Sequence, residues 1–111
     1  MEWTVGIDWG TEAHQVEIHS QEDGQEKNVE YSADMSGLYG LRDELLEKAD
    51  EPEQVKVGIE DPTRPIVRLL SETGMEIYIL NPRKVDSLRP VYADSEKKSD
   101  HLDAHVLCEE L

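Results

Sequence analysis

The spacing of apolar residues along this chain changes at Ser32. Before that point apolar residues form short runs or alternate with polar ones, as at residues 3–7 and at Val16 and Ile18. Short β-rich runs of this kind, separated by glycine-bearing turns, are typical of strands joined by hairpins. We therefore expect three antiparallel strands, the third of them at residues 27–32.

After Ser32 the apolar residues recur every three or four positions, which predicts an amphipathic helix. Asp34 or Ser36 can cap the N-terminus of this helix. An acidic stretch, residues 47–54, follows and is expected to be a solvated loop. The residues of the apolar stripe are Leu38, Leu41, Leu45 and Ala49.

Strand and helix then alternate, with a strand at residues 55–60, a helix at 63–74 that is closed by Gly74, and a strand at 75–80. Strands that follow each other through a helix pair in parallel by a right-handed crossover. The chain is therefore predicted to be an α/β protein with a mixed sheet, in which three antiparallel strands are followed by two parallel ones.

A short helix and then a loop are expected over residues 82–98, and a last helix begins near Ser99. Each helical residue advances about 100°, so Asp103 lies about 60° from Asp100 on the helix surface. Both aspartates share the apolar side, which also carries Ala104, Leu107 and Leu111. The opposite, polar side carries His101, His105 and Glu109.

Four acids occupy notable places. Asp100 alone is explained by the N-cap Ser99 and the helix dipole, but Asp103 lies among leucines inside the helix. Asp8 ends the apolar run of the first strand, and Glu60 ends that of the fourth. A single acid at a strand end usually marks where a strand leaves the core. If the first and fourth strands are parallel neighbours, the two acids emerge side by side and the last helix can close over them.

Carboxylates gathered in this way repel one another and raise each other's pKa values unless cations neutralise them. Oxygen-only ligands suit Mg²⁺ or Mn²⁺, and two such ions about 3.5–4 Å apart are the usual device of phosphodiester chemistry. The pattern therefore predicts a divalent metal site.

The charge balance counts against a nucleic-acid partner, because Lys and Arg number 11 against 26 Asp and Glu, for a net charge of −15. Nucleic-acid-binding proteins usually carry a basic surface. Three explanations remain open: no nucleic-acid partner, a salt-adapted organism, or a longer protein whose basic portion lies beyond residue 111.

Length and composition predict one domain of 111 residues in the cytoplasm. There is no apolar run of about 18 residues and no secretory leader, so no membrane partner is expected. Cys108 is the single cysteine and is interpreted as a small buried apolar residue. The chain stops inside its last helix without a terminating signal, which favours a piece of a longer protein.

Four motifs in this order resemble the DEDD transposases of bacterial insertion sequences, the one-ten family, and the related pilin-gene invertases. They are GID in the first strand, GIEDPTRP around the fourth, NPRKVDSLR after the fifth and KKSDHLDAHVL at the last helix. The resemblance covers essentially the whole chain, and K-x-D-x-x-D-A is its most specific part.

This resemblance implies a RuvC-like domain of RNase H fold with helices on both faces of the sheet. It also implies that Asp8, Glu60, Asp100 and Asp103 are the catalytic acids and that they bind Mg²⁺ or Mn²⁺. The family usually has alanine or proline, threonine and glycine after GIE. Residues 61–64 depart slightly from that pattern, which leaves the acid itself untouched.

Family members carry a separate carboxyl-terminal domain with a catalytic serine, and an element-encoded RNA directs them to DNA. The resemblance thus implies that residues 1–111 are one domain of a transposase that cleaves and exchanges DNA strands. DNA and a guide RNA are the implied partners, a homo-oligomer would form through the full-length protein, and the isolated domain would be incomplete. Expected local nucleic-acid contacts are Thr63, Arg64, Arg68, Arg83, Lys84, Arg89, Lys97 and Lys98.

Two other functions remain to be weighed. GIDWGTEAH is also similar to the first phosphate loop of actin-like ATPases and sugar kinases, in which Gly10 and Thr11 would bind nucleotide phosphate. No second glycine-rich loop occurs, and 111 residues cannot form a two-lobed cleft. The third possibility is a non-catalytic acidic module for dimerisation or docking, which a separation of Asp8 and Asp103 beyond about 10 Å would favour.

Overall fold

The computed structural model describes residues 2–92 and 102–111. The strands are β1 (Trp3–Asp8), β2 (Ala13–Ser20), β3 (Glu26–Ser32), β4 (Val55–Ile59) and β5 (Glu76–Ile79). The helices are α1 (Met35–Lys48), α2 (Pro65–Ser71), α3 (Pro82–Tyr92) and α4 (Leu102–Glu109), with a 3₁₀ turn η1 (Pro52–Gln54). The predicted succession of strands and helices is confirmed, although η1 replaces part of the expected loop. None of the described helices has the length and apolarity needed to cross a bilayer.

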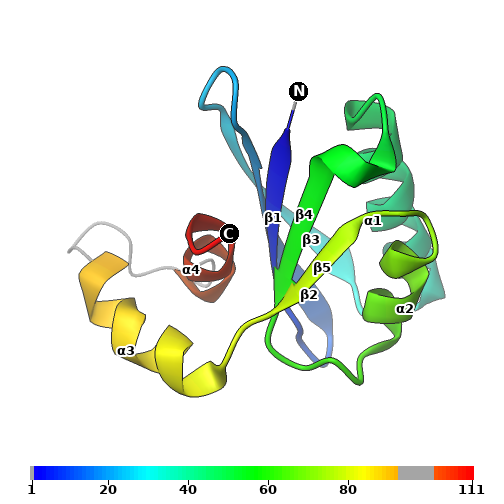
Figure 1. The fold of residues 1–111 in the computed structure, drawn as a ribbon. Coiled ribbons are helices and arrows are strands. Elements are labelled where there is room, and N and C mark those ends of the chain that lie inside the picture. The colour runs from blue at the N-terminus through cyan, green and yellow to red at the C-terminus, as the bar shows by residue number, and fades with distance from the viewer. Residues whose placement is uncertain (1, 93–101) are drawn as a thin grey trace.

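The five strands form one mixed sheet in the order β3-β2-β1-β4-β5 (Figure 1). The pairs β1–β2 and β2–β3 are antiparallel, whereas β1–β4 and β4–β5 are parallel. The condition for Asp8 and Glu60 to emerge side by side, a parallel pairing of the first and fourth strands, is therefore met. In its register Gly6 lies opposite Gly58, two residues before Asp8 and Glu60 respectively.

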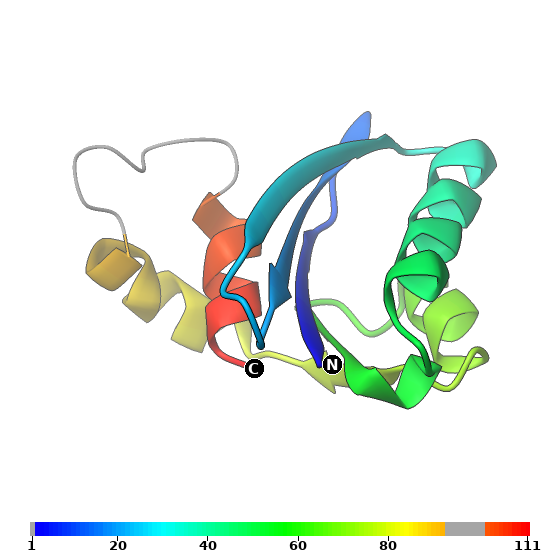
Figure 2. The same ribbon diagram turned by 90° about the horizontal axis from the view of Figure 1, so that it is seen from above.

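Helices cover both faces of the sheet, as expected for an RNase H-like fold (Figure 2). The helices α1 and α2 lie on one face, α4 lies on the other, and α3 packs against α4. The main core fills the space between the sheet and the pair α1 and α2. Its most deeply buried side chains are Val5, Ile7, Val16, Ile18, Leu41, Leu45, Val55, Val57, Ile66 and Leu70.

Local signals set the ends of these helices. Asp34 caps α1, because its side chain accepts a hydrogen bond of 2.8 Å from the amide of Gly37. Pro65 occupies the first turn of α2, where its missing N–H costs nothing. The turn after α2 requires a positive φ of 102° at Gly74, which glycine adopts without strain.

The sheet face beneath α4 carries glycine and polar residues rather than large apolar ones. On β1, Gly6 lies between Val5 and Ile7, which point into the main core on the other face. A Cβ atom at Gly6 would lie 2.0 Å from the carbonyl oxygen of Ala104 and 2.6 Å from the amide nitrogen of Cys108. The helix α4 therefore rests directly on the strand backbone, and Cys108 is buried there as expected.

The prediction that His105 lies on the polar side of the last helix, away from the sheet, is wrong, whereas Glu109 on the same side is exposed as expected. The side chain of His105 is only 12% exposed and pairs with Glu17 of β2. The reason is that α4 lies across β2 as well as β1, while Val85 of α3 packs on Val106 and Leu107 of the same helix. His101 lies outside the described residues.

We expect Gly6→Ala to destabilise the domain by about 1–3 kcal/mol, because the added methyl group meets backbone atoms of α4 that cannot rotate away. Gly40→Ala is the matched control. The nearest atom to a Cβ at Gly40 is a ring carbon of Tyr31 at 3.6 Å, an ordinary contact on an exposed helix, so its stability should rise by up to ~1 kcal/mol. Urea unfolding of the two variants measures both effects, and equal stabilities would contradict close packing at Gly6.

Candidate metal-binding active site

Three of the four predicted acids lie around one pocket at the carboxyl ends of the parallel strands. Asp8 is the last residue of β1, Glu60 directly follows β4, and Asp103 is in the first turn of α4. All three line a pocket of about 280 Å³. The fourth acid, Asp100, lies outside the described residues. The other residues that line the pocket are Ile7, Trp9, Ile59, Asp61, Arg64 and Arg89.

Asp103 is held by Arg89 of α3. The Nε of Arg89 donates to Oδ1 of Asp103 at 2.5 Å and its Nη2 donates to Oδ2 at 3.0 Å, a two-point pair. The guanidinium also contacts Asp86, and the hydrogen bond to Asp103 raises the pKa of Arg89. The sequence placed Arg89 among possible nucleic-acid contacts and gave no sign of this partner, which comes from a different helix.

The pocket carries more negative charge than its neighbours offset. Burial raises the pKa of Asp8, the charge of Asp103 raises it further, and the charge of Arg89 lowers it. Burial also raises the pKa of Glu60, with a further increase from Asp103, while Arg89 again opposes the shift. The ionised carboxylates of Asp8 and Glu60 are therefore less stable here than in water.

The rim of the pocket is built by the turn that follows Glu60. Oδ1 of Asp61 accepts hydrogen bonds from the amide of Thr63 at 2.9 Å and from its hydroxyl at 2.6 Å. Arg64 pairs with the other oxygen of Asp61 at 3.1 Å, and its guanidinium lies over the ring of Trp9, 5.6 Å from the centroid. Thr63 and Arg64 thus lie at the entrance, where a phosphate backbone could reach them.

The other expected nucleic-acid contacts are spread more widely. Arg83 and Lys84 begin α3, and Lys84 pairs with Glu110 at 3.5 Å. Arg68 pairs with Glu72 on α2, which lies on the face of the sheet opposite to α4. Lys97 and Lys98 lie outside the described residues.

In the turn between β1 and β2, the backbone amide that could bind a phosphate already donates a hydrogen bond within the turn. The amide of Gly10 donates to Nδ1 of His14 at 3.1 Å, and the His14 ring stacks on Trp9 with centroids 3.9 Å apart. A nucleotide phosphate at this turn would have to displace the imidazole from the Gly10 amide. The geometry therefore offers no support for the phosphate-loop interpretation at Gly10 and Thr11.

Comparison with known proteins agrees with the resemblance to DEDD transposases. The family model of the IS110-type DEDD transposases, described as a transposase, matches residues 5–111. A protein of Sinorhizobium fredii that is named as a candidate transposase is 29% identical over 112 residues, which is 96% of this chain and 30% of that protein. The chain thus spans less than a third of the length of this relative. Since the family match extends over nearly all of its residues, the chain belongs to the IS110-type family of DEDD transposases.

Proposed function

We propose that this chain is the metal-binding catalytic domain of a DNA transposase, which cleaves and exchanges DNA strands when an insertion sequence moves. Asp8, Glu60, Asp100 and Asp103 are the proposed ligands of Mg²⁺ or Mn²⁺. The observation that supports this most strongly is that Asp8, Glu60 and Asp103 come from three separate elements and line one pocket. Asp100 enters the proposal through the K-x-D-x-x-D-A motif alone.

The residues present fit such a metal. The donor set is made of carboxylates, which Mg²⁺ and Mn²⁺ prefer. Burial and mutual repulsion raise the pKa values of Asp8 and Glu60, so a divalent cation would relieve a charge imbalance that Arg89 offsets only in part. When bound, such ions activate the attacking oxygen of a phosphodiester displacement and stabilise the leaving oxygen. The same convergence of acids counts against a docking module without catalysis.

Arg89 has a proposed role in metal and DNA binding. Its guanidinium neutralises Asp103 while no cation is bound. A cation that takes over Asp103 would release the guanidinium at the pocket wall, and its planar fork matches a phosphate. Arg89 and the rim residues Thr63 and Arg64 would then contact the DNA backbone, joined by Arg83, Lys84, Lys97 and Lys98.

The remaining parts of the proposal concern the longer protein. With a net charge of −15, this domain cannot supply the main basic surface for DNA. We infer that residues 1–111 are the RuvC-like domain of a longer transposase, since they cover 30% of the Sinorhizobium relative. A second domain with a catalytic serine, an element-encoded guide RNA and assembly into a homo-oligomer complete the proposed machine.

Calorimetric titration with Mn²⁺ tests the site. The wild-type chain should give saturable heat, and Asp8→Asn should weaken binding at least roughly 10-fold because a ligand is lost. Asp61→Asn is the control, since Asp61 lines the same pocket but is bonded to Thr63 and is not in the proposed ligand set. Identical heats for the wild type and Asp8→Asn would overturn the assignment.

The raised pKa of Asp8 also predicts a stability effect without metal. At neutral pH in a chelator, Asp8→Asn should raise the melting temperature by on the order of a few degrees, because the ionised carboxylate is disfavoured in the folded state. The gain should fade as the pH falls through the raised pKa of Asp8 toward the ordinary value of 3.8, and it should be absent below 3.8, where Asp8 is protonated in both states.

Asp61→Asn provides the comparison of opposite sign. Hydrogen bonds from Thr63 lower the pKa of Asp61, so its charged form is favoured by folding and its replacement should lower the melting temperature. Thermal melts at pH 7 and below pH 3.8 measure both variants. A loss of stability in Asp8→Asn as large as that in Asp61→Asn would show that the pocket does not carry excess negative charge.

A further inference from the structure

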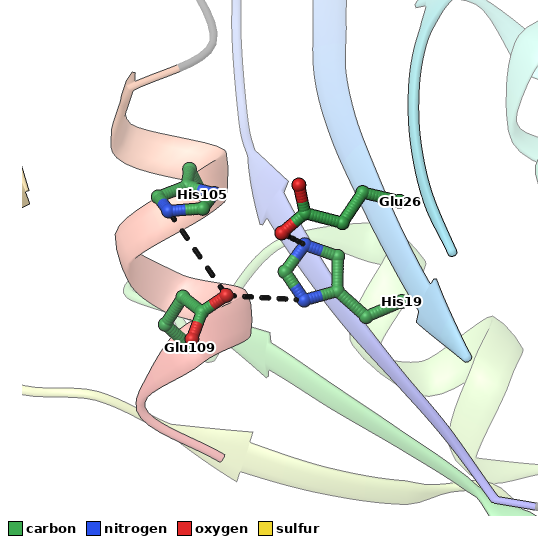
Figure 3. A group of neighbouring side chains, drawn as sticks. All are labelled: His19, Glu26, His105 and Glu109. Atoms are coloured by element: carbon green, nitrogen blue, oxygen red, sulfur yellow. Dashed lines mark ion pairs between the residues drawn. The ribbon is translucent and has the colours of Figure 1, made fainter. Parts of the chain in front are cut away.

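We propose that the chain has a second metal site of a different kind, at which His19, Glu26, His105 and Glu109 bind zinc. Figure 3 shows His19 on β2 and Glu26 on β3 facing His105 and Glu109 of α4. His19 lies opposite Thr4, near the start of β1, whereas the acid pocket lies at the end of that strand. This inference goes beyond the proposed function, because none of the four residues belongs to the acid pocket.

The ligand geometry is close to what zinc requires. Each of the four side chains can offer one ligand atom, and these atoms all lie within 4.8 Å of one another. Oε1 of Glu109 is 3.3 Å from Nδ1 of His19 and 4.0 Å from Nε2 of His105. Tetrahedral zinc with bonds of about 2.0–2.1 Å places neighbouring ligand atoms about 3.3 Å apart. Oε1 of Glu26 lies 3.3 Å from Nε2 of His19, on the other side of that ring from Glu109. The Glu26 side chain is 45% exposed, so it has room to turn toward an ion that Nδ1 of His19 binds.

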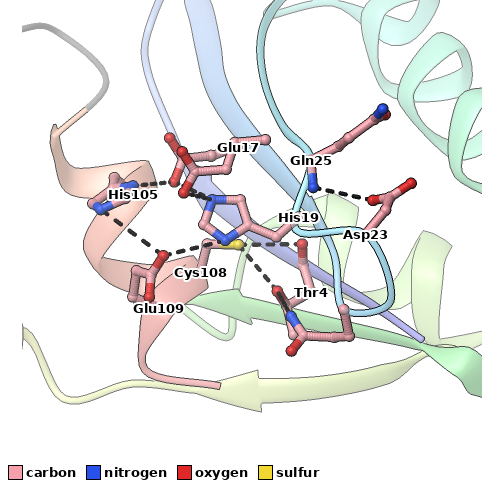
Figure 4. Close-up of polar contacts among 10 residues, drawn as sticks. Thr4, Glu17, His19, Asp23, Gln25, His105, Cys108 and Glu109 are labelled. Atoms are coloured by element: carbon pink, nitrogen blue, oxygen red, sulfur yellow. Dashed lines mark hydrogen bonds and ion pairs between the residues drawn. The ribbon is translucent and has the colours of Figure 1, made fainter. Parts of the chain in front are cut away.

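A buried carboxylate orients both imidazoles toward this site (Figure 4). Oε2 of Glu17, whose side chain is 4% exposed, lies 2.8 Å from Nε2 of His19 and contacts Nδ1 of His105. Burial would raise the pKa of Glu17, but hydrogen bonds and charge from the two histidines lower it. An ionised Glu17 can only accept, so each histidine donates to it and turns its other nitrogen toward Glu109. Zinc-binding histidines usually have such a carboxylate behind them.

The site can be reached from solvent. A pocket of about 250 Å³ opens beside His19, Glu26 and Glu109, which gives a metal ion an entry path. Cys108 also lies near His19 and Glu17, but it is buried and its thiol donates to the carbonyl oxygen of Thr4 at 3.2 Å. The exposed carboxylates of Glu26 and Glu109 are therefore better suited as the third and fourth ligands.

A proton on His19 is the competing occupant of this cluster. Burial lowers the pKa of His19, but hydrogen bonds and charge from Cys108 and Glu17 outweigh burial and raise it to about 10. A divalent cation must displace this proton to bind. The two alternatives, an ion-pair network and a zinc site, differ in whether added metal binds at this place.

A zinc ion here would be structural. It would connect β2 and β3 to the C-terminal half of α4, and the opposite end of the same helix carries Asp103. Zinc would thereby hold α4 against the sheet, and binding of metal to the folded state alone raises stability.

Titration of the metal-stripped chain with Zn²⁺ tests the site. Glu109→Gln should weaken binding at least roughly 10-fold, and His105→Gln should weaken it further. Glu110→Gln is the matched control, because it makes the same change of charge on the same helix but removes a partner of Lys84. Its affinity should stay within about twofold of the wild type. Equal affinities of Glu109→Gln and Glu110→Gln would overturn the proposal.

Cobalt supplies an independent readout on the folded wild-type chain. Co²⁺ should give the strong visible bands of a four-coordinate ion, and Glu109→Gln should lose them. Asp8→Asn should keep both these bands and the zinc affinity, which separates this site from the acid pocket. Loss of zinc binding in Asp8→Asn, or absence of the cobalt bands in the wild type, would leave the protonated ion-pair network as the correct description.

Discussion

The helix α4 packs directly on the backbone of β1 and β4, and both clusters of charged side chains depend on this contact. Gly6 and Gly58 remove the side chains that would otherwise hold the helix away, and a Cβ at Gly58 would lie only 3.0 Å from the carbonyl oxygen of Leu107. The approach brings Asp103 to the acid pocket and His105, two residues later on another side of the helix, to Glu17. Both clusters therefore depend on the absence of two side chains.

Much of the fold could be predicted from sequence because periodicity is a local property. Alternation in the first 32 residues and the later helical stripe gave the strands and helices in their observed order. The crossover rule then gave the parallel pairing of β4 with β5. The parallel pairing of β1 with β4 was only a condition in the prediction, and the sheet meets it, which places Asp8 beside Glu60. These two acids could be found from the sequence because each ends an apolar run on neighbouring strands.

The features that could not be predicted depend on which helices and strands contact one another in the folded chain. A helical wheel assumes one covered side, but α4 contacts α3 and also β2 beside β1, so the wheel misplaced His105, which pairs with Glu17 of β2. Glu17 and His19 fall on the polar positions of an alternating strand, which gives no sign that a helix covers them. The pair of Arg89 and Asp103 joins two helices by a contact that no motif encodes.

The topology also sets an order of assembly. The strand β1 is synthesised before α4, and the contacts between them join residues about as far apart as the chain allows. During synthesis the sheet can close its core with α1 and α2 while the other face of β1 stays open. Long-range contacts of this kind form slowly. A nascent chain therefore cannot bring Asp103 to Asp8 and Glu60 until α4 has left the ribosome and packed on β1.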